Sequence, residues 1–211
     1  NKFILDGTMF PHHPRTQAIL DAVTSDKLGA VDRIEANFTF MTDAAFQDTN
    51  IRGRKDGDLL GAIGDLGWYC VRFAQMVYAS QGKKPLSVQV VDFDLTKHEV
   101  PLDATCVVRF EGDSVLWFHC GFKTAYRQRF EICGSSKSLM LDDLVLPVKG
   151  PVSHTLKSSG LTNYALLTTN DVEEVKCEDC PVHEVLLWSA FSKIVKDMMV
   201  ASSDDSDATK W

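Results

Sequence analysis

The chain has 211 residues, of which 45% are hydrophobic and 24% are charged, and its formal net charge is −7. A chain of this length and composition can bury the core of one or two globular domains and is not expected to be disordered. The negative charge argues against nucleic acid as the main partner, since phosphate groups bind to basic surfaces. No apolar run approaches the roughly 20 residues that a membrane-spanning helix needs, so no transmembrane segment is expected.

The first predicted elements are a short strand, a helix and a longer strand. Residues 2–10 predict a short buried strand. Pro14 begins a helix that Gly29 ends, because proline favours the first turn of a helix and glycine the position after its end. Residues 31–41 alternate between apolar and polar side chains, which is typical of a strand with one buried face. The apolar members of this strand are Ile34, Ala36, Phe38 and Phe40.

The middle of the chain contains a polar loop, a helix and then consecutive strands. Residues 42–60 predict a loop that is long enough to suggest a function, and residues 65–79 predict the second helix. Short links around Gly112 and Gly134 predict antiparallel neighbours in a meander. Proline and glycine break the region 147–181, and residues 182–200 predict a third helix. The predicted strands after the second helix are 87–95, 104–110, 115–122, 127–133 and 138–146.

This order of elements predicts the fold class. Helices come early and late, and strands follow one another between them, which favours an α+β fold with an open, mostly antiparallel sheet and helices on one face. The other face of such a sheet can stay uncovered. We therefore expect that face to form a homodimer or to dock the chain into a larger protein assembly.

The six cysteines predict reduced thiols rather than disulfides. Most of them lie in apolar, strand-like runs, where cysteine behaves as a small buried hydrophobe. This indicates an intracellular, reducing compartment, either the cytoplasm or an organelle stroma. Cys177 and Cys180 form a CxxC pair with His183 nearby, but a zinc site needs a fourth ligand and a thioredoxin-like site needs a βαβ fold. No metal is expected.

Asp65 and Tyr69 are the strongest candidates for chemistry. Their spacing of four residues would place both side chains on one face of a helix, where a carboxylate and a phenol could exchange a proton. The alternative is structural, with an acidic residue favoured by the helix dipole and a tyrosine half-buried in the core.

Arg52, His12 and His13 are candidates for substrate binding. Arg52 lies in the polar loop and could hold an anionic group, although a solvated basic loop has the same composition. His12 and His13 lie where the first strand meets the first helix, a junction that often faces a cleft, and adjacent histidines also occur in exposed turns. No Gly-x-Gly-x-x-Gly follows a strand, so no dinucleotide site is expected in this chain.

Three segments carry a resemblance to a known family. They are DGTMFPHHPR (6–15), GAIGDLGWYC (61–70) and GSSKSLMLDDLVLP (134–147). Together and in this order they resemble the glucose–fructose oxidoreductase / inositol dehydrogenase (Gfo/Idh/MocA) family of NAD(P)-dependent oxidoreductases, and within it the dihydrodiol-dehydrogenase-like branch. The resemblance covers nearly the whole chain.

The resemblance implies a domain organisation and a site. Family members have an N-terminal Rossmann domain, of which residues 1–10 resemble the last strand, and a C-terminal substrate and dimerisation domain, which residues 11–211 resemble without its C-terminal end. Tyr69 and Asp65 match the family's Asp-x-x-x-His/Tyr pair, with Tyr69 as the acid/base. The family's catalytic lysine and Gly-rich loop would lie upstream of residue 1. NAD or NADP would therefore bind to the full-length parent and not to this chain alone.

Two functional hypotheses follow. In the first, the chain is the substrate-binding and dimerisation domain of an oxidoreductase that acts on a small-molecule CH–OH group of a sugar-like or diol compound, and the chain alone is inactive. In the second, it is a non-catalytic structural or scaffold subunit of a larger assembly, since a fold does not guarantee an activity.

Overall fold

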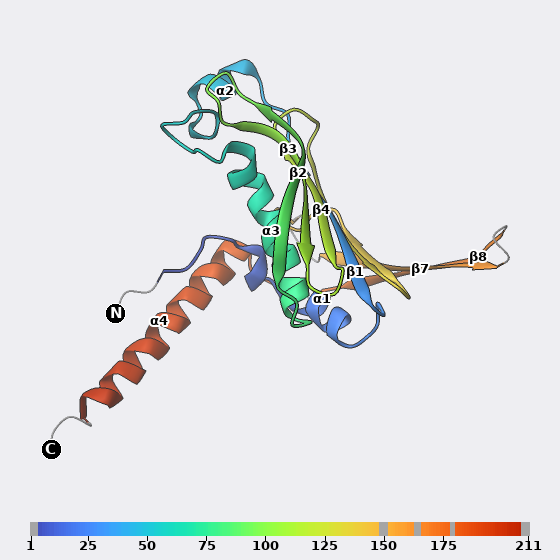
Figure 1. The fold of residues 1–211 in the computed structure, drawn as a ribbon. Coiled ribbons are helices and arrows are strands. Elements are labelled where there is room, and N and C mark those ends of the chain that lie inside the picture. Colours follow the sequence, from blue (N-terminus) through green and yellow to red (C-terminus); the bar gives the residue numbers. More distant parts are fainter. Residues whose placement is uncertain (1–3, 148–151, 163–165, 178–179, 208–211) are drawn as a thin grey trace.

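The computed structural model describes residues 4–147, 152–162, 166–177 and 180–207. Within them, one eight-stranded sheet has the order β2-β3-β4-β1-β5-β6-β7-β8, and α1 and α3 lie on one side of it (Figure 1). This confirms the predicted α+β class. The strands are β1 Val31–Thr39, β2 Pro85–Leu95, β3 Pro101–Phe110, β4 Val115–Gly121, β5 Arg127–Gly134, β6 Ser138–Leu141, β7 Ser153–Thr162 and β8 Leu166–Lys176. The helices are η1 Phe10–His12, α1 Pro14–Thr24, α2 Ala44–Thr49, η2 Ile51–Gly53, η3 Ile63–Gly67, α3 Trp68–Ala79 and α4 His183–Asp207.

The sheet is mostly antiparallel, as predicted, but it is not a simple meander. β1 lies between β4 and β5, parallel to the first and antiparallel to the second. Ala36 of β1 pairs with Phe118 of β4 and with Phe130 of β5, so a small side chain separates two large ones in the core layer. The five-residue link 122–126 can cross the roughly 10 Å that one intervening strand occupies, at up to about 3.3 Å per residue. A short link therefore did not require its strands to be neighbours.

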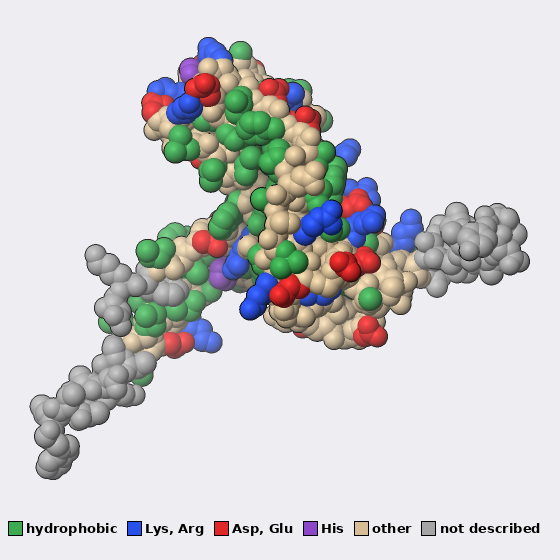
Figure 2. Space-filling model, in the orientation of Figure 1, with side chains coloured by type: hydrophobic (Ala, Val, Ile, Leu, Met, Phe, Trp, Pro, Cys, Tyr) green, Lys and Arg blue, Asp and Glu red, His purple; other side chains and the backbone are tan. Residues whose placement is uncertain are grey.

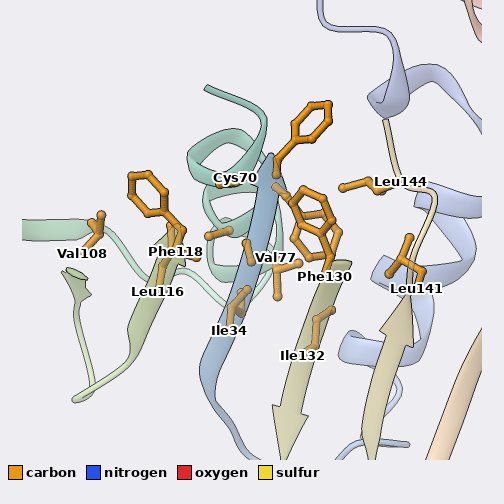
Figure 3. Packing of buried hydrophobic residues seen from close by; sticks show 14 of the residues in the cluster. Ile34, Cys70, Val77, Val108, Leu116, Phe118, Phe130, Ile132, Leu141 and Leu144 are labelled. Atoms are coloured by element: carbon orange, nitrogen blue, oxygen red, sulfur yellow. The ribbon is translucent and has the colours of Figure 1, made fainter. Parts of the chain in front are cut away.

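The core lies between the sheet and the helices α1 and α3. Alternate residues of the central strands point into it, as the predicted period of two requires, and Figure 3 shows these side chains facing α3. Phe130 is fully buried, and its ring centroid lies 5.3 Å from that of Phe73 on α3. Such aromatic pairs are stabilised beyond the area that they bury. This packing fixes α3, and with it the start of that helix, against the sheet.

Several predicted boundaries were wrong for local reasons. Residues 4–9 form no strand, and Ile4 is 90% exposed, because no described strand pairs with this segment. The predicted loop 42–60 contains α2 and η2, which begin where Asp43 and Asn50 accept hydrogen bonds from backbone N–H groups. The strand predicted over 138–146 ends at Leu141.

The region 147–181, predicted to be broken by proline and glycine, contains the hairpin β7–β8. Its strands pair over their whole length, and the register shifts between Gly160 and Leu161. Glycine in a strand often marks such an irregularity rather than an end. Helix α4 is longer than the predicted 182–200, and Figure 1 shows it projecting away from the sheet. Within the described part of the chain, no helix has the length and apolar character that crossing a membrane requires.

Candidate functional site

The segment that carries Asp65 and Tyr69 begins with a widened helical turn. A continuous helix was predicted from residue 65, whereas Asp65 lies in the π-helical turn Ile63–Gly67 and Tyr69 in the first turn of α3. Gly67 has a steric role here, because a Cβ atom at this position would lie 3.1 Å from the Cys120 sulfur and 3.3 Å from the Phe118 ring. The turn therefore rests directly on β4, which fixes the place of Asp65.

Arg52 forms an ion pair with Asp65. The Arg52 Nε lies 2.7 Å from the Asp65 Oδ1, and the two side chains are 39% and 21% exposed. Asn50 positions Arg52 by accepting a hydrogen bond from its backbone N–H at 3.1 Å. The structure thus brings together two of the sequence candidates that lie 13 positions apart, and places Tyr69 beside them.

These three residues line one pocket of about 440 Å³. Most of its remaining wall is apolar, which is usual for a small-molecule site with a few polar groups at one end. The other lining residues are Met9, Phe38, Phe40, Phe46, Leu66, Tyr126, Val145 and Leu146. The Phe38 ring packs edge-on against Tyr69 at a centroid distance of 5.7 Å, which holds the phenol in the wall of the pocket.

The environment of Tyr69 keeps its phenol protonated. Burial raises the pKa of Tyr69, the Asp65 carboxylate raises it further, and the Arg52 guanidinium partly opposes these effects. Among the described residues the Tyr69 hydroxyl donates no hydrogen bond. It is therefore a proton donor with an uncommitted hydrogen at neutral pH, and a poor base in the absence of an added cation.

Neither His12 nor His13 lines this pocket. His13 is buried and caps α1, where its Nδ1 accepts the Arg15 backbone N–H at 3.0 Å. Its Nε2 lies 3.3 Å from the Cys180 sulfur. His12 ends η1 and is half-buried. The predicted contact of these histidines with substrate stays a prediction, and the position of His13 is explained by the helix cap.

The sequence did not reveal the aromatic and apolar wall. Phe38 and Phe40 were identified as one face of a strand, but not as part of a pocket. Phe46 lies in a segment that was predicted to be a loop, and Tyr126 lies in the predicted link between two strands. Gln128 supports the far wall, because its side-chain oxygen accepts the backbone N–H groups of Val145 and Leu146 at 3.0 and 2.9 Å. Only the alternation of β1 carried a signal for any of these residues.

The described residues offer no cluster of metal ligands, and two of the glycines before α3 serve packing within the protein. No group of three or more His, Cys, Asp or Glu side chains among those residues could hold a metal ion. The glycines before α3 also do not fit a dinucleotide. A Cβ atom at Gly61 would collide with the Pro101 carbonyl oxygen, and Gly67 packs on β4, so both are needed for packing within the protein.

The fold and pocket define a class of protein, an α+β domain with an open sheet whose helix-covered side carries a substrate-sized pocket. The model of the GFO/IDH/MocA C-terminal domain family matches residues 16–140, more than half of the chain, so the chain belongs to this family. This confirms the resemblance read from the three sequence segments.

Curated relatives are oxidoreductases that are longer than this chain. An uncharacterized oxidoreductase, ORF334, of Rhizobium meliloti is 28% identical over 143 residues, or 65% of this chain and 39% of that protein. The dTDP-3,4-didehydro-2,6-dideoxy-alpha-D-glucose 3-reductase of Streptomyces violaceoruber is 29% identical over 173 residues, or 80% of this chain and 48% of that protein. The chain thus spans less than half the length of these relatives.

Solved structures show the same fold. KijD10, a 3-ketoreductase from Actinomadura kijaniata in complex with NADP and TDP-benzene, superposes with a TM-score of 0.72 at 17% identity, over 92% of this chain and 55% of that one. An inositol dehydrogenase homolog from Azotobacter vinelandii in complex with NAD+ gives a TM-score of 0.63 at 12% identity, over 80% of this chain and 42% of that one. These relatives carry nicotinamide cofactors in chains about twice as long as the matched part.

Proposed function

We propose that this chain is the substrate-binding domain of an oxidoreductase that uses NAD or NADP to interconvert a carbonyl and an alcohol on a sugar-like or diol compound. The observation that carries the proposal is the uncommitted Tyr69 hydroxyl in a 440 Å³ pocket beside the Arg52–Asp65 ion pair. The family and the sugar-modifying relatives support the substrate class. The nucleotide would bind outside this chain.

The chemistry of the pocket favours the reductive direction. Reduction of a ketone requires a hydride at the carbonyl carbon and a proton at the carbonyl oxygen. The nicotinamide, when bound, supplies the hydride. Tyr69 would donate the proton, since its raised pKa keeps the phenol protonated and a positioned general acid typically contributes about 10²–10⁴-fold in rate. In the oxidative direction the tyrosinate would need the cation that the family's upstream lysine provides.

The remaining pocket residues would orient the substrate. Asp65 and Arg52 can hydrogen-bond hydroxyl groups, while Phe38, Phe40 and Phe46 offer an aromatic wall. A sugar ring has an apolar face and a hydroxyl-bearing edge, so it matches a pocket divided in this way. A deoxysugar or a cyclic diol, with fewer hydroxyl groups to satisfy, suits the largely apolar lining best.

The same proposal covers the boundary of the domain, the association of two copies and the cellular compartment. Residues 1–10 would connect to a preceding nucleotide-binding domain, and the uncovered sheet face would pair with a second copy. The six cysteines are free thiols, which supports a reducing compartment. Trp68 Nε1 donates to the Thr8 hydroxyl at 2.8 Å, so the segment before η1 is attached at the start of α3, next to the pocket.

A scaffold role is the second candidate, and one surface favours it. Every residue of the edge strand β2 is exposed, including Leu86, Val88, Val90 and Phe93. Figure 2 shows hydrophobic side chains gathered over the part of the molecule where Figure 1 places β2 and β3. Apolar patches of this kind often mark protein interaction sites.

A nicotinamide-coupled assay of the natural polypeptide separates the two candidates. Oxidation of NADH or NADPH on addition of keto-sugars or keto-deoxysugars, followed by absorbance, is expected for the oxidoreductase. No turnover with any of them, together with co-purification in a stable complex with other proteins, would favour the scaffold role and overturn the enzymatic proposal.

A further inference from the structure

A second pocket lies on the open face of the sheet. It measures about 320 Å³ and is found where β1 and β4 end and β5 begins, since Thr39 pairs with Gly121 on one side and with Arg127 on the other. Its lining residues are Asn37, Thr39, His119, Thr124, Ala125, Tyr126 and Arg127. Tyr126 is the one residue that also lines the Tyr69 pocket.

Four side chains in this pocket have uncommitted hydrogen-bond donors. Within the described part of the chain, the Arg127 guanidinium, the Asn37 amide, and the Thr124 and Tyr126 hydroxyls form no hydrogen bond or ion pair. Burial raises the pKa of Tyr126, so its hydroxyl keeps its proton. Thr39 is different, because its hydroxyl donates to the Ala125 carbonyl at 2.8 Å and so anchors the 122–126 link.

The His119 ring forms a fixed wall of the pocket. Its Nδ1 lies 3.0 Å from the Thr105 hydroxyl, and its Nε2 lies 3.6 Å from the Asp103 Oδ1. Asp103 is 8% exposed, and this oxygen has no hydrogen-bond partner. Gly121 provides the space for it, because a Cβ atom at 121 would collide with the Asp103 carboxylate. The carboxylate is therefore behind the imidazole rather than in the opening.

Two acidic side chains near the pocket are each paired with a cation. Asp94 on β2 is 2.9 Å from Lys123, and Glu131 on β5 is 3.1 Å from Arg129. Arg127 is the cation that lines this pocket, and among the described residues it forms no ion pair. A guanidinium presents a planar fork of N–H groups that matches the two oxygens of a carboxylate or phosphate.

We propose that this open-face pocket binds an oxyanion, a phosphate or carboxylate group, through Arg127. Asn37, Thr124 and Tyr126 complete the set of donors. Asn37, Thr124 and Tyr126 can also accept hydrogen bonds, so the guanidinium of Arg127, which has no acceptor, is the group that favours an anion over a neutral ligand. The proposal does not depend on the catalytic role of Tyr69, since it concerns binding in the absence of cofactor and turnover.

Calorimetric titration of the protein with inorganic phosphate, pyrophosphate and citrate tests this proposal. The ionic strength is held constant, so that screening does not differ between titrations. We expect saturable binding of at least one of them at one site per chain, and the three titrations separate a phosphate ligand from a carboxylate ligand. No saturable binding of any of the three would overturn the proposal.

Matched variants locate the site. Arg127→Gln should weaken binding at least tenfold, and Asn37→Asp, which places a negative charge in the pocket, should do the same. Arg109→Gln is the control, because Arg109 is exposed on the same face and lies four positions along β3 from Thr105, the residue that pairs with His119 of the pocket. The dissociation constant of the Arg109→Gln variant should stay within twofold of that of the unsubstituted protein. Equal weakening by Arg127→Gln and Arg109→Gln, or none by Arg127→Gln, would contradict the assignment.

Discussion

The two faces of the same sheet differ in what they bury and in what they leave free. On β1, Phe38 points to the helix-covered face and packs against Tyr69, whereas its neighbour Asn37 points to the open face and lines the polar pocket. On β5, Phe130 is fully buried and Arg129 is exposed. Adjacent residues of one strand therefore belong to opposite faces of the sheet. The packed core and the candidate reaction centre both lie on the helix-covered face.

The largest expected difference between the faces is in stability. Phe130→Ala removes a ring that packs on Phe73 in the core and should lower the free energy of unfolding by about 3–5 kcal/mol. Arg129→Ala, one residue away, should change it by about 0.5 kcal/mol or less, since the Arg129–Glu131 pair is partly exposed. Urea unfolding of both variants measures this contrast. Similar losses for the two would mean that the open face is also packed.

A smaller loss of stability is expected when the pH is lowered, and it comes from His154 on β7. Burial, reinforced by Arg15, lowers the pKa of His154 to about 4, whereas its ordinary value is 6.5. As the pH falls from 6.5 to 4, the unfolded chain gains a proton that the folded chain does not. Stability is therefore complete above pH 6.5 and should decrease by about 2 kcal/mol between pH 7 and pH 5 from this group.

His154→Gln isolates this contribution. Urea unfolding of both proteins at pH 7 and pH 5 should show a smaller pH dependence in the variant, because glutamine does not titrate. An equal loss of stability in both proteins at pH 5 would assign the acid sensitivity to other groups.

The smallest expected effect is a change in the pKa of Tyr69, caused by the charged residues of its pocket. Asp65→Asn should lower the pKa of Tyr69, and Arg52→Gln should raise it, because the carboxylate and the guanidinium act on the phenol with opposite signs. An absorbance titration of tyrosine ionisation, with Tyr69→Phe subtracted to identify its signal, measures both shifts. Shifts of the same sign would contradict the proposed arrangement.

Local patterns in the sequence predicted the local structure well. The alternation of β1, the proline that begins α1, and the hairpin links at Gly112 and Gly134 depend on neighbours within a few residues, and each was found. The predicted end of that helix at Gly29 was wrong, because α1 ends at Thr24. The position of β1 between β4 and β5 could not be predicted in this way, because it depends on pairing between residues about 80 to 100 positions apart. The β7–β8 hairpin was missed because proline and glycine were read only as breakers.

The candidate site was predictable only in part. Asp65 and Tyr69 are close in the chain, so their proximity could be inferred from helix geometry even though the turn is wider than an α-helical one. Arg52 was a candidate, but its ion pair with Asp65 depends on how the α2–η2 segment folds over the sheet. The convergence of Phe46, Tyr126 and Val145 on the same pocket is a tertiary property that no local pattern of residues carries.

The most direct test of the central claim is the turnover number of the natural polypeptide with Tyr69→Phe, compared with Tyr78→Phe. Both variants remove one phenolic hydroxyl from α3, but the Tyr78 hydroxyl donates to the Val115 carbonyl at 2.7 Å inside the core and lies outside the pocket. Below the unfolding temperature of both variants, Tyr69→Phe should lower the turnover number about 10²–10⁴-fold, and Tyr78→Phe should leave it unchanged. Normal turnover by Tyr69→Phe would contradict the assignment of this pocket as the site of the reaction.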